Sequence, residues 1–225
     1  MMRAIRTILL LAGKDLRIEA RSRQTLALVI VLGLLIVVVL GLGLAAGQKT
    51  SPTAATAILW VAYLFGGVLC FEKTMGVERQ DAALGALLLA PVDRGLIYVA
   101  KLVTNLVLML GLAAVVTPAA VVLFDFDLSA NPAGFFTVTL MGMVGFAAIG
   151  TLFSAVVSST RLQGGLLAMV VFPLCLPLVV SSTQIMIRLF GEARPLTAHD
   201  VGLLGAFDAV YLVSSWLTFE KILEP

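Results

Sequence analysis

The chain has 225 residues, of which 60% are hydrophobic and only 12% are charged, and its mean hydropathy is +1.09. An ordinary globular domain has roughly 45 to 50% apolar and about 25% charged residues, so this composition excludes a soluble fold and indicates a membrane protein. The net charge of +2 is too small to predict nucleic-acid binding, and the scarcity of polar sequence excludes disorder.

Residues 1–24 are predicted to form an amphipathic helix that lies in the membrane plane. At about 100° per residue, apolar side chains share one arc of this helix and cations share another. The apolar arc holds Ile5, Ile8, Leu9, Ala12, Leu16 and Ala20, and the cationic arc holds Arg3, Arg6, Lys14, Arg17 and Arg21. Such a helix suits the boundary of anionic headgroups, although the same charges could act as a topology signal alone.

Six apolar stretches are long enough to cross a bilayer as helices, because a hydrocarbon core about 30 Å thick requires about 20 residues. The first stretch and its basic flank are longer than in a secretory signal peptide, so this stretch is predicted to be retained. The remaining sequence is too short for a sizeable soluble domain, which predicts one all-α membrane domain over residues 1–225. The predicted spans are 25–46, 53–71, 102–123, 134–158, 164–187 and 201–219.

Lysine and arginine residues are distributed unequally between the two sides of these spans. Twelve of the fifteen would lie on one side, and only Lys49, Arg188 and Arg194 would lie on the other. Because short loops rich in these residues are retained in the cytoplasm, both termini are predicted to be cytoplasmic.

Residues 72–94 form the longest predicted cytoplasmic connection and combine charged ends with a short, leucine-bearing helix. Asp81 could cap this helix, and Pro91 would end it. The helix is too short to span the membrane and has an apolar face that needs a partner surface. This pattern favours the docking of a soluble subunit, and the alternative is a helix folded back against the bundle.

Two features inside the spans are candidate functional sites. Asp208 lies in the last span, where a carboxylate is costly, although it would be interfacial if that span began later. Pro173 and Pro177 lie in the fifth span, and each removes a backbone hydrogen bond, so this helix must kink or break. A kink suits a moving or conduit-lining helix, and a static kink is the alternative.

The sequence predicts no catalytic or metal site. Residues 43–50 resemble a phosphate-binding loop, but Gln48 stands where its second glycine is required. No esterase, zincin or covalent haem-attachment motif occurs. The only histidine, His199, lies near Glu192 and Asp200 in an outer connection that is predicted to be a solvated loop.

Two series of residues in the chain form a recognisable order and spacing. They are Trp60, Val61, Ala62, Glu72, Asp81, Leu84, Leu87, Pro91 and Lys101, followed by Pro173, Leu174, Pro177 and Leu178 in the fifth span. In these motifs the chain resembles the cytochrome c maturation protein B family, the permease subunit of the haem exporter. The resemblance covers nearly the whole chain, and Ala82 and Gly85 depart from the glycine and glutamate that relatives usually carry.

The resemblance implies a type-2 ABC exporter permease with six transmembrane helices in a bacterial inner membrane. It implies a cytoplasmic ATPase subunit as partner, contacted by a coupling helix. Further implied partners are a tryptophan-rich haem-handling membrane subunit, a small single-span subunit and a periplasmic haem chaperone. The residues that match the coupling segment are Glu72, Glu78, Asp81, Leu84, Leu87 and Pro91.

By the same resemblance, the chain is expected to bind no cofactor itself, with ATP bound by the partner and haem as a cargo. The ATP cycle would drive either haem export or the release of a haem-loaded periplasmic chaperone. The alternatives are a generic type-2 exporter of a drug, lipid or polysaccharide, a membrane scaffold without transport, and an intramembrane enzyme that uses Asp208.

Overall fold

The computed structural model describes residues 2–22, 24–45, 51–80, 93–125, 127–159 and 165–222. All regular structure within these ranges is helical, which confirms the predicted all-α membrane fold. The elements are α1 (Met2–Ser22), α2 (Gln24–Ala45), α3 (Pro52–Gln80), α5 (Arg94–Phe124), η1 (Leu128–Ala130), α6 (Pro132–Ser159), α7 (Leu166–Gly191) and α8 (Ala198–Ile222).

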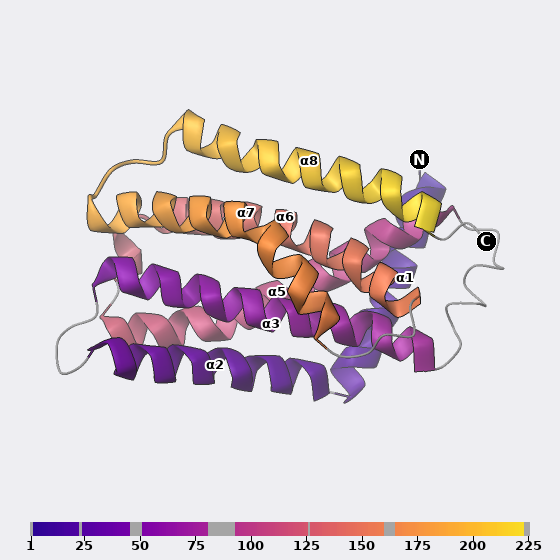
Figure 1. Ribbon diagram of the computed structural model, residues 1–225, viewed down its shortest axis with the longest axis horizontal. Coiled ribbons are helices and arrows are strands. Elements are labelled where there is room, and N and C mark those ends of the chain that lie inside the picture. Colours follow the sequence, from indigo (N-terminus) through magenta and orange to yellow (C-terminus); the bar gives the residue numbers. More distant parts are fainter. Residues whose placement is uncertain are drawn as a thin grey trace.

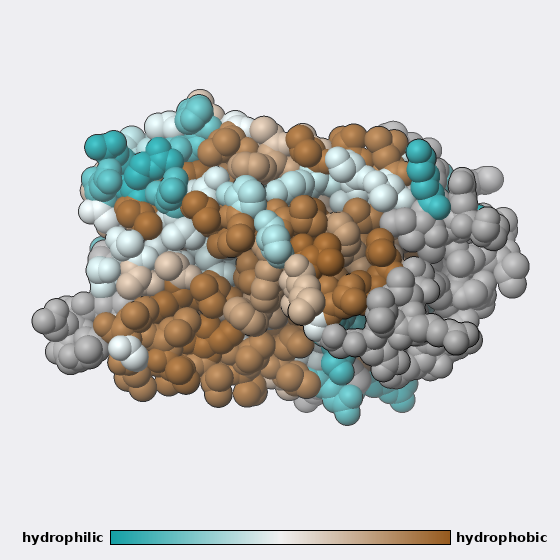
Figure 2. All heavy atoms as spheres, in the orientation of Figure 1, coloured by the Kyte–Doolittle hydropathy of each residue, from teal (hydrophilic) through white to brown (hydrophobic). Residues whose placement is uncertain are grey.

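Six of these helices, α2, α3 and α5 to α8, are long and apolar enough to cross a membrane, as predicted. They run side by side along the long axis of the molecule (Figure 1). Apolar side chains cover the middle of the face shown in Figure 2, and hydrophilic side chains gather toward its two ends. The start of α1 and the end of α8 lie at one end of the bundle. We call it the inner end, following the predicted orientation, and the opposite one the outer end.

The third spanning helix begins earlier than its hydropathy indicates. α5 starts at Arg94, whereas the apolar stretch was predicted to start at residue 102. Asp93 explains the early start, because its side chain accepts a hydrogen bond of 2.9 Å from the backbone N–H of Gly95 and so caps the helix. Hydropathy therefore indicates which residues lie in the hydrocarbon region, whereas the N-cap residue determines where the helix begins.

The amphipathic helix α1 crosses the inner end of the bundle at a steep angle to the spans (Figure 1). Its predicted apolar arc is divided between two environments. Ala12 is buried and Leu16 packs against the main core, but Ile5 and Leu9 are 50% and 63% exposed. The exposed part of this arc is suited to the membrane surface, in agreement with an interfacial helix.

Glycines on α6 allow the bundle to close around bulky side chains from α3. A Cβ atom at Gly142 would overlap Trp60, and one at Gly150 would overlap Phe71. Both aromatic side chains are at most 1% exposed. Close approach at small residues is the usual basis of helix association in lipid, where burial of apolar surface gives no advantage. α6 contacts four other spanning helices, as do α3 and α5, and these three helices form the centre of the fold.

Candidate functional site in the bundle interior

Asp208 is buried within a membrane-spanning helix. It lies ten residues after the first residue of α8, and it is 9% exposed. The structure therefore favours the intramembrane alternative over the interfacial one. Its Oδ1 atom is buried and has no hydrogen-bond partner among the described residues. Gly145 of α6 makes room for the carboxyl group, since a Cβ atom there would lie 2.5 Å from Asp208 Oδ1.

The proline-containing helix α7 packs at the same place. It is continuous from Leu166 to Gly191 and bends along its length (Figure 1), so the two prolines kink the helix without breaking it. Tyr211 of α8 donates a hydrogen bond of 2.9 Å to the backbone carbonyl of Leu174, which lies between Pro173 and Pro177. A side chain of α8 thus donates a hydrogen bond to a backbone carbonyl in the segment of α7 between its two prolines.

Asp208 and the proline pair therefore belong to one junction of three helices. They were predicted as two unconnected features. Gly145 of α6 is the centre of this junction. A Cβ atom at this glycine would lie 2.9 Å from Leu178 of α7 and 3.4 Å from Tyr211 of α8, in addition to its approach to Asp208. We call these residues, together with Pro173, Leu174 and Pro177, the α6–α7–α8 junction.

A second acidic residue on α8 is fully partnered and joins the outer ends of two helices. Asp200 is 4% exposed, and its Oδ1 atom lies 2.7 Å from Arg188 Nη2 of α7. Its Oδ2 atom accepts hydrogen bonds from the Thr197 hydroxyl at 2.7 Å and the Thr197 backbone N–H at 3.1 Å. Asp200 was predicted to lie in a solvated loop, and this prediction is wrong. The spacing of Thr197 and Asp200 resembles a capping box and could have indicated a helix start here.

Polar side chains at the inner end attach α1 to the spans. Lys101 Nζ of α5 lies 2.7 Å from Asp15 Oδ2 of α1, and the two side chains are only 4% and 9% exposed. Glu19 of α1 accepts a hydrogen bond of 3.0 Å from the backbone N–H of Leu26 in α2. Because the third span was predicted to start at residue 102, Lys101 was expected on the cytoplasmic side of the membrane, and this buried ion pair was not predicted.

A buried polar cluster lies next to this attachment. Asn105 of α5 donates a 2.9 Å hydrogen bond to the hydroxyl of Thr151 on α6, and its Oδ1 atom lies 2.7 Å from Thr74 Oγ1 of α3. These contacts join three spanning helices near the inner end. Because a hydrogen-bonded amide is costly to separate from its partners in the membrane, the cluster fixes the relative positions of α3, α5 and α6.

The predicted coupling segment is described only at its start. Glu72 is half-buried near the inner end of α3, and Glu78 lies six residues further along the same helix. The predicted positions Asp81, Leu84, Leu87 and Pro91 lie outside the described residues. Their role as an ATPase contact therefore stays a prediction.

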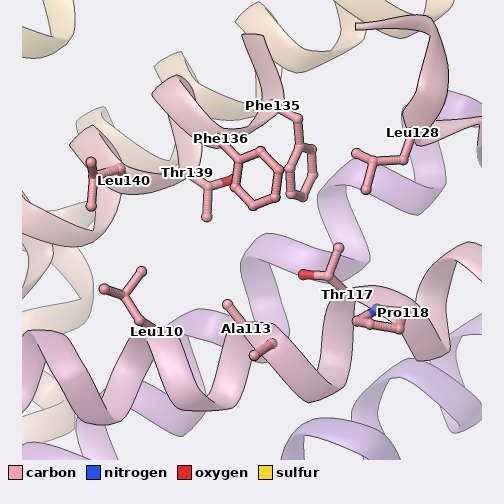
Figure 3. Close-up of a pocket in the computed structure, with 10 residues that line it drawn as sticks. Leu110, Ala113, Thr117, Pro118, Leu128, Phe135, Phe136, Thr139 and Leu140 are labelled. Atoms are coloured by element: carbon pink, nitrogen blue, oxygen red, sulfur yellow. The ribbon is translucent and has the colours of Figure 1, made fainter. Parts of the chain in front are cut away.

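A pocket of about 390 Å³ opens between α5 and α6 toward the outer end. Figure 3 shows Thr117 and Pro118 of α5 on one side and Phe136 and Thr139 of α6 on the other. Thr117 Oγ1 lies 2.6 Å from the hydroxyl of Tyr63, whereas Thr139 Oγ1 has no partner among the described residues. The pocket lining contains no histidine, cysteine, methionine or tyrosine, and so it provides no side chain of the kinds that usually bind haem iron axially.

Comparison with protein-family models identifies the chain. The model described as CcmB protein matches residues 6–223, which is nearly the full length. The chain belongs to the CcmB family. This result confirms the resemblance to the cytochrome c maturation protein B family, whose members are membrane permeases. A search of curated proteins found no significant match.

Membership of the CcmB family agrees with the arrangement of the spans. The match includes the amphipathic helix α1 from residue 6 onward, all six spanning helices and the residues of the α6–α7–α8 junction. Among the described residues, no three histidine, cysteine, aspartate or glutamate side chains converge as metal ligands. The buried polar features described in this CcmB-family chain include the junction around Asp208, the Arg188–Asp200 pair, the inner-end contacts of α1 and the cluster around Asn105.

Proposed function

We propose that this chain is the permease subunit of an ABC complex that handles haem for cytochrome c biogenesis. The observation that supports the proposal is the CcmB family match over residues 6–223 of a chain with six apolar helices. ATP would be hydrolysed by a cytoplasmic partner subunit. Haem would be the cargo of the complex and not a cofactor bound by this chain.

The ATP cycle would act on this chain through residues 72–94 at the inner end. The energy would then be used either to export haem or to release a haem-loaded chaperone on the periplasmic side. Besides the ATPase, the partners would be a tryptophan-rich haem-handling membrane subunit, a small single-span subunit and the periplasmic haem chaperone. The interfacial helix α1 would contact membrane lipid through its exposed apolar and cationic side chains.

Deletion of the gene should abolish the assembly of c-type cytochromes, and expression of the full chain should restore it. The measurement is haem staining of covalently attached cytochromes in membrane and periplasmic fractions. A tagged chain purified from native membranes in mild detergent should also retain an ATPase together with haem-handling subunits. Normal c-type cytochromes in a clean deletion would reject the proposal, and recovery of an ATPase alone would favour a generic exporter.

Substitutions Leu87→Asp and Asp81→Lys should weaken binding of the ATPase while leaving membrane insertion intact, because each places an unsuitable group on the proposed contact surface. The measurement is the amount of ATPase retained by the tagged variant relative to the parent chain. Arg194→Ala, on the predicted outer side, is the matched control and should retain the ATPase in full. Normal retention by both coupling-segment variants would show that this segment is not the docking site.

A further inference from the structure

We propose that Asp208 is a proton-binding site whose carboxyl group is protonated in the conformation described here and releases its proton to water when α8 separates from Gly145 and α7. The inference concerns the α6–α7–α8 junction and does not depend on which cargo the complex handles. It follows from the charges, the hydrogen bonds and the packing around this side chain.

The helices that pack around Asp208 supply no positive charge for it. α6 contains no charged residue, and Arg188, the only one on α7, lies at the outer end and pairs with Asp200. The contact of α8 with α5 is at the inner end, through Gly95 and Trp216, and Lys101 of α5 pairs there with Asp15. Within the described part of the chain, Asp208 thus has no counter-charge.

The other titratable side chains at the junction are also uncharged at neutral pH. They are Tyr211 on α8, whose hydroxyl bonds to the carbonyl of Leu174, and the buried Cys175 on α7. Among the described residues, Asp208 Oδ1 has no hydrogen-bond partner, and the backbone N–H of Gly145 is a neutral group that approaches the carboxyl. An ionised carboxylate in such a place would cost several kcal/mol, and a buried carboxyl group without a counter-charge takes up a proton instead. The Asp208 carboxyl group is therefore protonated in this conformation.

The same packing makes release of the proton depend on helix movement. The carboxyl group fits where it does because Gly145 lacks a side chain. Tyr211 lies three residues after Asp208 on α8, and its hydroxyl bonds to the backbone of α7 between the two prolines. A displacement of α7 would therefore also change the packing around the Asp208 carboxyl group. Once water reaches the carboxyl group, its O–H bond breaks, the electron pair remains on the carboxylate, and the proton passes to a water molecule.

Infrared spectroscopy tests the proposal directly on the full chain purified in an ester-free detergent. At pH 7 the parent protein should show the C=O stretching band of a protonated carboxylic acid. Asp208→Asn should lose this band entirely, whereas Asp200→Asn, which changes an ion-paired acid on the same helix, should keep it. Raising the pH should remove the band from the parent protein reversibly.

Identical spectra for the parent protein and Asp208→Asn in this region would overturn the proposal, because they would mean that Asp208 is not protonated at pH 7. A band that persists at every pH would overturn the release step. If Asp208→Asn does not accumulate, the parent protein with carboxyl-labelled ¹³C-aspartate serves instead. Labelling should then shift the band to lower frequency, and an unshifted band would exclude a protonated aspartate.

Discussion

Gly142→Ala and Gly150→Ala will each destabilise the purified protein, because aromatic rings already occupy the space that a Cβ atom would need. The obstruction is Trp60 at the first position and Phe71 at the second, and both rings are fully buried. Phe71 is further confined by an edge-to-face contact with Phe146, at a centroid distance of 5.1 Å. Overpacking of this kind costs about 1 to 3 kcal/mol per site. Leucine at the same positions should prevent the protein from accumulating.

Gly43→Ala and Gly202→Ala are the matched controls. Both glycines lie in spanning helices, and a Cβ atom at either would meet no atom within 4 Å. The measurement is the thermal unfolding of each variant in detergent. Unfolding is monitored as the loss of the monodisperse peak in size-exclusion chromatography after heating. Equal melting temperatures for the two pairs of variants would contradict the prediction and would mean that the rings can move aside freely.

Lys101→Met will release α1 from the bundle, because it removes the buried cation that ties the Asp15 carboxylate of α1 to α5 and leaves this carboxylate only the half-exposed Lys14 of its own helix. The two atoms lie 2.7 Å apart, and both side chains are nearly inaccessible. Removing one member of such a pair costs about 3 to 5 kcal/mol, whereas replacing both by apolar groups is often neutral. We therefore expect the double variant Lys101→Met, Asp15→Leu to be considerably more stable than Lys101→Met alone.

The neighbouring Lys14 provides the control for this comparison. It also pairs with Asp15, at 3.2 Å, but its side chain is 45% exposed, and exposed pairs contribute about 0 to 1 kcal/mol. Lys14→Met should therefore leave the melting temperature nearly unchanged. Proteolysis of α1 in sealed inverted vesicles reports directly on its release. A cleavage rate for Lys101→Met equal to that of Lys14→Met would show that the buried pair does not hold α1.

Hydropathy predicted the six spans because the membrane imposes a minimum length of apolar sequence on each helix. It could not place the helix ends where they depend on single side chains. Asp93 extends α5 beyond the apolar stretch by capping it, and Thr197 with Asp200 sets the start of α8. These contacts involve one or two residues, so an average over about 20 positions does not detect them.

The candidate site was predicted only as separate parts. The cost of a carboxylate in a span indicated Asp208, and the loss of backbone donors indicated Pro173 and Pro177. Their common location depends on Gly145, which lies on another helix and has no distinguishing feature in the sequence. Asp200 and Lys101 were misjudged for a related reason. Each is polar and close to a span end, and only the fold shows the partner that allows its burial.

The bend in α7 gives the permease a mechanical asymmetry between its two ends. On the outer side, the Arg188–Asp200 pair fastens α7 to α8, so these helix ends should move as one piece. On the inner side, the arm from Leu166 to Pro173 is about 10 Å long, and a change of about 10° at the prolines would move its tip by about 2 Å. This arm touches α3 through Phe172 and Phe65. A force on the inner tip of this arm would therefore bend α7 at the prolines, close to its contact with α3, while the outer ends of α7 and α8 stayed paired.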